Sequence, residues 1–221
     1  VGSEMCIRDR ICSHLGIPFG AAASTGIPVY MPWLGKKAYD GIMAAYTAAS
    51  RKNGKKYIPL IKNATQLYVI EKGALCGVVL DGSYNLTEAN YKTSLQNMVD
   101  RVLITDKDGN QIGVVEDTAA QQKYGVVQTV YKQEDGKDAQ TEAKALLQTL
   151  EQTGSVTGCP GDSRAVSGYA LIVQETTTGL FGKFYIESDT HTFTDGKHEM
   201  ALTLAFSNMM DEKEIENQSQ G

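Results

Sequence analysis

The chain of 221 residues lacks the features that mark several classes of protein. No apolar run approaches the roughly 20 residues of a membrane-spanning helix. The four cysteines form no Cys-x-x-Cys and have no zinc-ligand spacing, which indicates reduced, incidental thiols. Three histidines leave few candidates for hydrolytic chemistry, and a net charge of −5 argues against a surface that coats nucleic acid. An ordinary soluble chain remains, long enough for one large domain or two small ones.

The first ten residues, VGSEMCIRDR, have a weak apolar pattern and no initial methionine. Residues 4–9 are what GAG-ATG-TGT-ATA-AGA-GAC encodes, which looks like a transposon-type sequencing adaptor read in frame. We therefore exclude residues 1–10 from fold prediction, as one would an expression scar. We expect Ile11 to be an interior residue of a longer protein, cut at its N-terminal side by the end of a metagenomic read.

Residues 179–212 organise the chain, because they predict one β-hairpin and its approach strand. Met200, Leu202, Leu204 and Phe206 alternate with small or polar residues, which gives the second strand one apolar face. Asp195-Gly196 suits a type I′ turn, in which both central residues need positive φ. With these two residues as the loop, the predicted partners are Phe193 with His198, His191 with Met200, and Asp189 with Leu202.

Residues 11–85 predict a small α+β unit. A helix ends at residues 11–15 with Gly16 after it, and a second helix covers residues 37–52, where Tyr39, Ile42, Met43 and Tyr46 form an apolar stripe. A hairpin follows over residues 57–61 and 66–71, and a third strand over residues 75–80. Pro59 places the first of these strands at a sheet edge.

Residues 86–210 predict a mostly antiparallel, β-barrel-like domain with one packed helix, so the overall fold class is α+β. The helix spans residues 139–152, with Asp138 as its cap and a buried stripe of alanine and leucine. Asp117 caps a shorter helix that ends at Gly125. The predicted strands are residues 91–105 (102–104 most clearly), 111–116, 126–131, 155–156, 164–166, 169–175 and 183–188. Residues 211–221 form a polar tail that we expect to fray.

Asp189, His191 and His198 are the main candidates for chemistry. A carboxylate that orients a histidine is half of a catalytic triad, but neither Ser188 nor Ser207 sits in a nucleophile elbow. A metal site would need all three side chains to converge, and the register separates the two histidines by one diagonal step. We therefore favour a structural Asp–His hydrogen bond at the rim of a β core.

The other candidate groups favour structural readings. His14 is isolated, and Glu134, Asp135 and Asp138 belong to a solvated loop. Asp106, Asp108 and Asn110 mimic the start of a calcium loop, but the required glycine and bidentate glutamate are missing, which favours a hairpin turn. Gly158, Gly161 and Gly168 precede no helix, so they form no phosphate-binding loop. We predict no catalytic residue, metal or cofactor, although carboxylates brought together only by folding remain an alternative.

Beyond these patterns, most of the chain resembles the XkdQ/YqbQ family, tail proteins of phage-like elements such as PBSX and of contractile-tailed phages. The resemblance runs from about residue 11 to residue 212, through TGIPV, GKKAYDGIMAAYTAASRKNGKKYIPL, LYVIEKG, SLQNMVDRVLITDKDGNQIGVVED and YGVVQTVYKQEDGKDAQTEAKALL. It is most specific over SGYALIVQETTTGLFGKFYIESDTHTFTDGKHEMALTLAFSNMMDE. The residues of this structural signature are Gly179, Leu180, Gly182, Asp189, His191, Gly196, Met200, Leu202, Leu204 and Phe206.

The resemblance implies a non-enzymatic baseplate hub that joins the tail tube to the spike of a contractile tail. Such hubs are trimers of chains with two barrel-like domains, and DNA passes through their central channel. It also implies a location in the virion tail, assembly in the bacterial cytoplasm, no stable membrane association, and an N-terminal β domain that this chain lacks. Two alternatives stay open: a tail-associated peptidoglycan hydrolase, and a carbohydrate-binding module, for which Trp33 is the single tryptophan.

Overall fold

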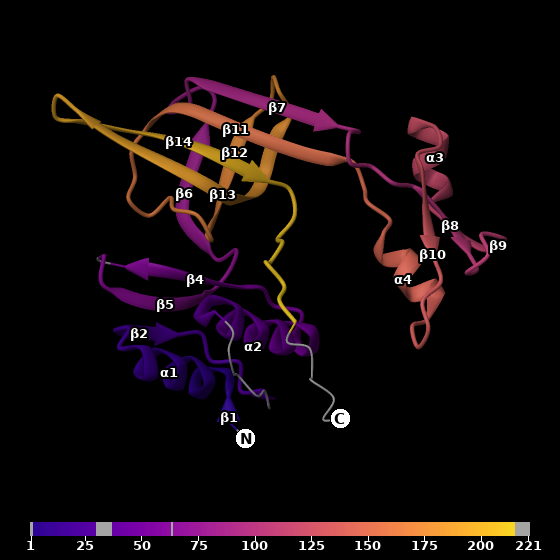
Figure 1. Ribbon diagram of the computed structural model, residues 1–221. Helices are drawn as coiled ribbons and strands as arrows, with labels where there is room; N and C mark the ends of the chain where they lie inside the picture. The colour runs from indigo at the N-terminus through magenta and orange to yellow at the C-terminus, as the bar shows by residue number, and fades with distance from the viewer. Residues whose placement is uncertain (1, 30–36, 63, 215–221) are drawn as a thin grey trace. The chain divides into compact units, whose positions relative to one another are not determined.

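The computed structural model describes residues 2–29, 37–62 and 64–214, and its fold class is α+β (Figure 1). The chain divides into two units, of which the first contains Val1–Asn90 and Gly154–Gly221, and the second Tyr91–Thr153. Trp33 lies outside the described residues. Within the described residues, no helix is both long and apolar enough to cross a membrane.

The first unit holds two helices and most of the strands. Its elements in chain order are β1 (Gly2–Ser3), α1 (Glu4–Leu15), β2 (Phe19–Ala22), β3 (Pro28–Val29), α2 (Ala38–Asn53), β4 (Tyr57–Lys62), β5 (Gln66–Glu71), β6 (Leu75–Asp81), β7 (Glu88–Ser94), β11 (Glu151–Pro160), β12 (Ala170–Glu175), β13 (Leu180–Thr194) and β14 (Lys197–Ala205). Strands β7 and β11 lead into and out of the second unit. β1 and β3 form a two-stranded sheet of their own.

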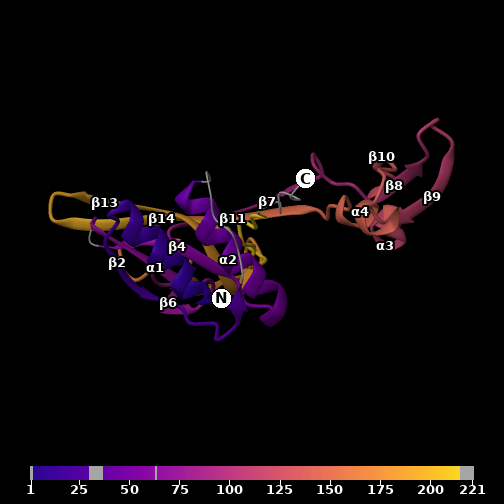
Figure 2. The ribbon, with the colours of Figure 1, turned by 60° about the horizontal axis from the view of Figure 1, so that its bottom comes forward.

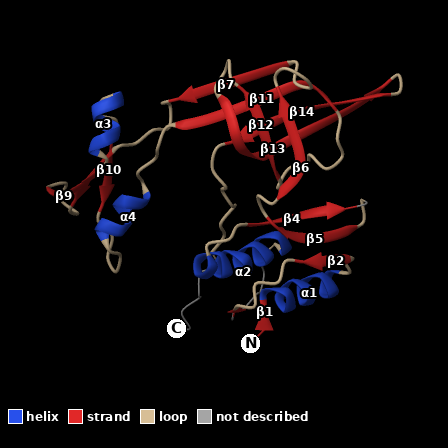
Figure 3. Cartoon of the chain, turned by 180° about the vertical axis from the view of Figure 1, so that it is seen from behind, coloured by secondary structure: helices blue, strands red, loops and turns tan. Residues whose placement is uncertain are grey.

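Helices α1 and α2 pack on each other beside a three-stranded sheet of order β2-β5-β4 (Figure 3). Three residues of the predicted stripe of α2 are buried, and Ile42 and Tyr46 pack with Tyr57 of β4 and Val69 of β5. The fourth, Tyr39, is 44% exposed. The helix ends at Gly54, whose φ of 73° suits a residue without a Cβ. β4 is an edge strand, as Pro59 predicts.

Helix α1 ends at Leu15, as predicted, but it begins at Glu4, inside the segment that we excluded. Arg8 is 4% exposed and donates a hydrogen bond of 2.8 Å to the carbonyl of Gly20. Its guanidinium lies 4.8 Å from the centre of the Phe19 ring. Residues 4–10 therefore belong to the folded unit, whereas their origin from an adaptor stays a prediction.

A six-stranded sheet of order β6-β12-β13-β14-β11-β7 forms the rest of the first unit. Its core contains buried leucine, valine and phenylalanine side chains, including Leu171, Phe184 and Leu204. β6 was predicted to belong to the α+β unit of residues 11–85, but it pairs in parallel with β12 and joins this sheet instead. Among the described strands no ladder joins β6 to β7, so the sheet is open and only barrel-like.

The predicted hairpin is confirmed in register and turn. Phe193 pairs with His198, His191 with Met200 and Asp189 with Leu202. Asp195 and Gly196 have φ angles of 50° and 74°, as a type I′ turn requires. Figure 2 shows this β13–β14 hairpin extending beyond the other strands of its sheet.

The second unit is a three-stranded sheet of order β10-β8-β9 with two short helices. Its elements are β8 (Arg101–Thr105), β9 (Gln111–Glu116), α3 (Thr118–Tyr124), β10 (Gln128–Lys132) and α4 (Ala139–Ala145). Asp117 and Asp138 cap the two helices as predicted, through side-chain bonds to Ala120 and Thr141. Val102, Ile104 and Ala143 form its core.

Three secondary-structure predictions are wrong. The predicted strand over residues 91–105 is two strands, because β7 ends at Ser94 and β8 begins at Arg101 in another sheet. The helix over residues 139–152 ends at Ala145, because Gln148 instead exchanges two backbone hydrogen bonds of 2.9 Å with Val99. Of the predicted buried stripe of this helix, Ala143 is buried but Leu146 is 38% exposed. β11 then begins at Glu151. The predicted strand over residues 164–166 is a turn, in which the Asp162 carboxylate accepts from the Arg164 backbone N–H at 2.9 Å.

The polar tail that we expected to fray from residue 211 is held over residues 211–214. The hydroxyl of Tyr39 donates to Asp211 at 2.9 Å, and Lys56 pairs with Glu212 at 3.0 Å. Glu214 pairs with Arg51. Composition alone did not predict this, because each acidic residue finds a partner on α2 or directly before β4, more than 150 positions away along the chain.

Candidate functional site

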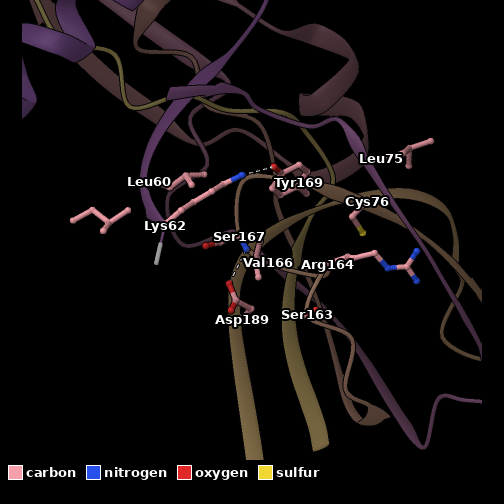
Figure 4. A pocket seen from close by; sticks show the side chains of 11 residues that line it. Leu60, Lys62, Leu75, Cys76, Ser163, Arg164, Val166, Ser167, Tyr169 and Asp189 are labelled. Atoms are coloured by element: carbon pink, nitrogen blue, oxygen red, sulfur yellow. Dashed lines mark hydrogen bonds between the residues drawn. The ribbon is translucent and has the colours of Figure 1, made fainter. Parts of the chain in front are cut away.

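A pocket of about 730 Å³ opens beside the loop of residues 161–169, within the first unit (Figure 4). Strands β4, β6 and β13 and this loop supply its walls. The lining residues are Leu60, Ile61, Lys62, Leu75, Cys76, Ser163, Arg164, Val166, Ser167, Tyr169 and Asp189. The pocket is the candidate functional site, because it brings the Asp189 carboxylate together with Lys62, Arg164 and the Cys76 thiol.

Several hydrogen bonds tie the pocket loop to the hairpin, and three of them involve Asp189, His191 and His198. The Asp189 carboxylate accepts from the Ser167 backbone N–H at 2.6 Å. His191 Nε2 lies 3.1 Å from the Ala165 carbonyl oxygen, and the Gly161 N–H donates to the His198 carbonyl at 2.7 Å. The polar groups on the inner face of the hairpin therefore serve to hold the pocket loop.

His191 and His198 are direct partners, which the register did not lead us to expect. His191 Nδ1 lies 2.8 Å from His198 Nε2, so the diagonal step that separates them is bridged by the imidazole rings. His198 is also stacked on Phe193, with ring centres 4.1 Å apart and planes at 17°. The expected Asp–His hydrogen bond is replaced: Asp189 stands 3.6 Å from His191 Nε2 and bonds to the loop.

This arrangement does not support nucleophilic catalysis. Both nitrogens of His191 are engaged, by His198 and by Ala165, so neither is available to activate a hydroxyl group. Ser188 is exposed and alternates with Asp189 along β13. Within the described residues, no group of three or more histidine, cysteine, aspartate or glutamate side chains could hold a metal ion.

The two cations of the pocket differ in their partners. Lys62 Nζ lies 3.4 Å from the Tyr169 hydroxyl and 5.2 Å from the centre of the Tyr68 ring. Arg164 pairs with Asp162 at 2.6 Å, and these hydrogen bonds lower the pKa of Asp162 to about 2. The Lys62 ammonium therefore contacts a hydroxyl group and an aromatic ring, whereas Arg164 is paired with a carboxylate.

The remaining candidates have structural roles. His14 is exposed in the last turn of α1. Asp106 accepts from the N–H groups of Asp108 and Asn110 at 2.9 and 2.8 Å, which closes the hairpin turn between β8 and β9. Glu134 and Asp135 pair with Lys137 and Lys107, and Asp138 caps α4.

The predicted loop glycines also have a packing explanation. A Cβ on Gly161 would lie 2.1 Å from the His198 ring, and one on Gly158 or Gly168 would lie 2.7 or 2.9 Å from its neighbours. Such close approach is a recognised reason for glycine. These glycines serve contact between elements rather than phosphate binding.

The structural signature falls on turns and core positions. Gly179, Gly182 and Gly196 have φ angles of 80°, 132° and 74°, which side-chain-bearing residues rarely adopt. Four of the apolar signature residues are at most 2% exposed: Leu180, Met200, Leu202 and Leu204. Phe206 meets Phe184 edge to face at 5.1 Å. The signature thus specifies a packed hairpin.

Lys62, Arg164, Ser167 and Tyr169 are the pocket residues that the sequence did not indicate. The pocket depends on β4 and on a loop about one hundred residues later. Neither segment carries a spacing that predicts a site by itself. Lys62 directly follows the predicted edge strand of residues 57–61, in a predicted turn, which gives no indication of a site.

The chain is similar in sequence and fold to phage tail proteins. A family model described as YQBQ-like matches residues 4–205. The chain is 26% identical over 233 residues to the phage-like element PBSX protein XkdQ of Bacillus subtilis (strain 168), covering 95% of this chain and 67% of that protein. It is 24% identical over 217 residues to YqbQ of the same organism, covering 91% and 65%.

Solved structures share the fold. The 43 kDa tail protein of prophage MuSo2 from Shewanella oneidensis aligns with a TM-score of 0.61 at 14% identity, over 92% of this chain and 64% of that one. A tail protein from Neisseria meningitidis MC58 aligns with a TM-score of 0.54 at 12% identity, over 92% and 66%. The chain spans about two thirds of the length of these relatives.

Proposed function

Because the chain belongs to the YQBQ-like family of phage tail proteins, we propose that it is a structural subunit of the baseplate hub of a contractile tail. In this role it joins the tail tube to the spike, in a phage, a defective prophage or a phage-tail-like particle. It acts by shape and by pairing of strands, without catalysis.

The proposal rests on the contacts that the polar residues on the inner face of the β13–β14 hairpin make. Asp189, His191 and His198 are the most promising chemical groups of the chain. The side chains of Asp189 and His191 bond to the loop of residues 161–169, and the His198 imidazole bonds to His191 while its backbone carbonyl accepts from Gly161. A rigid sheet with a tied loop is what a load-transmitting ring subunit needs. A peptidoglycan hydrolase would need a free carboxylate or imidazole facing the pocket.

The partners of the proposed hub follow from its position. β6 and β7 are the outer strands of the six-stranded sheet, and a homotrimer could extend this sheet between neighbouring copies. Tail tube, spike and other baseplate proteins would contact the trimer. DNA would pass through its channel only transiently, to which a net charge of −5 is suited.

Location and loss of function test the proposal together. The chain is tagged in its natural host context, tails are isolated, and the tag is labelled with gold for electron microscopy. We expect label at the tube–baseplate junction only, and no contractile tails when the gene is removed. Label along the whole tail, or normal tails without the gene, would contradict a hub.

The hydrolase alternative is tested on the same protein. Purified chain is incubated with bacterial cell walls, beside a variant with Asp189→Ala and His191→Ala. We expect no digestion by either, and lower stability of the variant. Digestion that the variant loses while its circular dichroism stays native would support the enzyme instead.

A further inference from the structure

Residues 207–214, which we call the C-terminal strap, form no helix or strand and contact α2 and the start of β4. Met210 packs against the core of α1, α2 and the small sheet, and the Tyr57 N–H points at its sulfur at 3.4 Å. The Lys72 ammonium donates to the Met209 carbonyl at 2.7 Å, and the Lys213 N–H donates to the Thr47 hydroxyl at 3.1 Å. A single apolar side chain thus anchors a polar segment.

The surface beneath the strap is unusually basic for this protein. Residues 51–56, RKNGKK, hold four of the 21 lysines and arginines in a chain whose net charge is −5. We call Arg51, Lys52, Lys55, Lys56 and Lys72 the basic face. They surround the C-terminal end of α2, where the helix dipole also favours cations. The strap contacts Arg51, Lys56 and Lys72, whereas Lys55 pairs with Glu71 at 2.7 Å.

The strap meets this face with carboxylates. Glu212 lies 3.0 Å from Lys56 and 3.8 Å from Arg51, and Glu214 also pairs with Arg51. Asp211 accepts from the Tyr39 hydroxyl at 2.9 Å, and burial together with this carboxylate raises the pKa of Tyr39 to about 12. Tyr39 therefore keeps the proton that it donates throughout the neutral range.

Each of these ion pairs is exposed, and a single exposed pair contributes little. Their combination with the half-buried Met210 is different, because this apolar side chain fixes the register of the strap and the charges of the face select an acidic segment. A methionine followed by aspartate and glutamate, laid on lysine, arginine and tyrosine, is the pattern of a short docked peptide.

We propose that the basic face is a docking site for a short acidic segment led by methionine, and that the strap of a second copy can replace the resident one. The resident strap shows the chemistry of the occupant directly. Because a second copy carries the same residues, exchange keeps every contact and changes only which chain supplies it. The exchange adds a link between copies that the sheet edges do not provide, and it does not depend on the hub role.

A peptide-binding experiment tests the docking site. A fluorescent peptide of residues 207–214 is titrated into the full chain and into a strap-disarmed chain with Met210→Ser, Glu212→Gln and Glu214→Gln. The attached strap competes at an effective concentration in the millimolar range, so we expect at least about tenfold tighter binding to the disarmed chain. Affinity should fall as salt rises from 50 to 500 mM.

Charge reversal on the face supplies the specificity control. Adding Arg51→Glu and Lys56→Glu to the disarmed chain should weaken binding at least about tenfold, and a peptide with serine at the Met210 position should bind weakly too. Lys107→Glu with Lys137→Glu removes two exposed, ion-paired lysines elsewhere and should change nothing. If the reversed chain unfolds by circular dichroism, Arg51→Gln with Lys56→Gln replaces it.

A mixing experiment tests exchange between copies. In the strap-disarmed chain, the basic face is not held by its own strap. A second chain, with Arg51→Glu and Lys56→Glu but an unchanged strap, has a strap that its own face cannot bind. We expect the two to associate when mixed, by size-exclusion chromatography with light scattering, to a greater extent than either does alone. No added association of folded chains at 100 μM overturns exchange, and equal peptide binding by wild-type and disarmed chains overturns the docking site.

Discussion

His191 Nδ1 lies 2.8 Å from His198 Nε2, and the opposite nitrogen of His191 lies 3.1 Å from the carbonyl oxygen of Ala165. A carbonyl can only accept, so His191 Nε2 carries a proton. In the neutral pair, His191 Nδ1 then accepts from His198. The tautomer of one ring is therefore set by a backbone group of the pocket loop.

The first prediction is this tautomer. Above pH 8, where imidazoles are ordinarily neutral, long-range ¹H–¹⁵N spectra of His191 should show the Nε2–H form. His14, exposed in the last turn of α1, serves as the internal reference for an imidazole that no neighbour constrains in this way. An Nδ1–H form of His191 would mean that the bond to Ala165 is absent in solution.

The second prediction concerns Gly161, which lies against the other histidine. A Cβ added at Gly161 would lie 2.1 Å from the His198 ring, far inside any normal contact. We expect Gly161→Ala to lower the free energy of unfolding by about 1–3 kcal/mol in urea denaturation, because the ring or the loop must shift.

A double-mutant cycle assigns the cause of that loss. His198→Ala removes the ring, so adding Gly161→Ala to it should cost less than it does alone, with a coupling of about 1 kcal/mol or more. Equal costs in both backgrounds would show that the loss does not come from contact with the His198 ring.

Local signals explain what could be predicted of this hairpin. Its turn residues, its alternation and its register all depend on neighbours within twenty positions, so Asp195-Gly196 and the pairing of Asp189 with Leu202 followed from sequence. The contact of His191 with His198 did not follow from sequence, because the register fixes which Cα atoms are paired and does not fix the side-chain rotamers that bring the two rings together.

Long-range contacts explain what could not be predicted. Local propensity favoured a helix through residue 152, but pairing of Gln148 with Val99 ends it early. The pocket joins Lys62 to Arg164, and the strap joins Glu212 to Lys56, across more than one hundred residues each. The acidic run at 211–214 and the basic run at 51–56 are both visible in the sequence, yet nothing local connects them.

The third prediction is a pH dependence at Glu175, after β12. Its carboxylate accepts from the Thr178 hydroxyl, from the Thr178 N–H at 2.7 Å and from the Thr177 N–H at 2.9 Å. These bonds, that of the Thr178 hydroxyl first, lower its pKa from 4.5 to about 2. Because the folded value is depressed, the stabilisation is present above about pH 4.5 and is lost as pH falls toward 2.

Carboxyl ¹³C titration should give a midpoint near pH 2 for Glu175. In urea unfolding, Glu175→Gln should be less stable than the wild type at pH 6, and the difference should shrink steadily by pH 2.5. A difference that stays constant over this range would show that the glutamine disturbs the turn for reasons unrelated to charge.

The fourth prediction is that the second unit can be removed. Its core of Val102, Ile104 and Ala143 shares no residue with the core of the six-stranded sheet. Strands β7 and β11, which lead into and out of it, are neighbours in that sheet. We therefore expect residues 95–150 to be replaceable by Asn-Gly, a two-residue turn that suits adjacent antiparallel strands.

The shortened chain should keep the two-state unfolding and near-ultraviolet circular dichroism of the first unit, with a free energy of unfolding within about 1 kcal/mol of that unit in the full chain. A shortened chain with Gly-Gly in place of Asn-Gly separates the effect of the turn from that of the deletion. Loss of cooperative unfolding in both chains would mean that the first unit needs the second to fold, and that the separation of their cores does not make them independent.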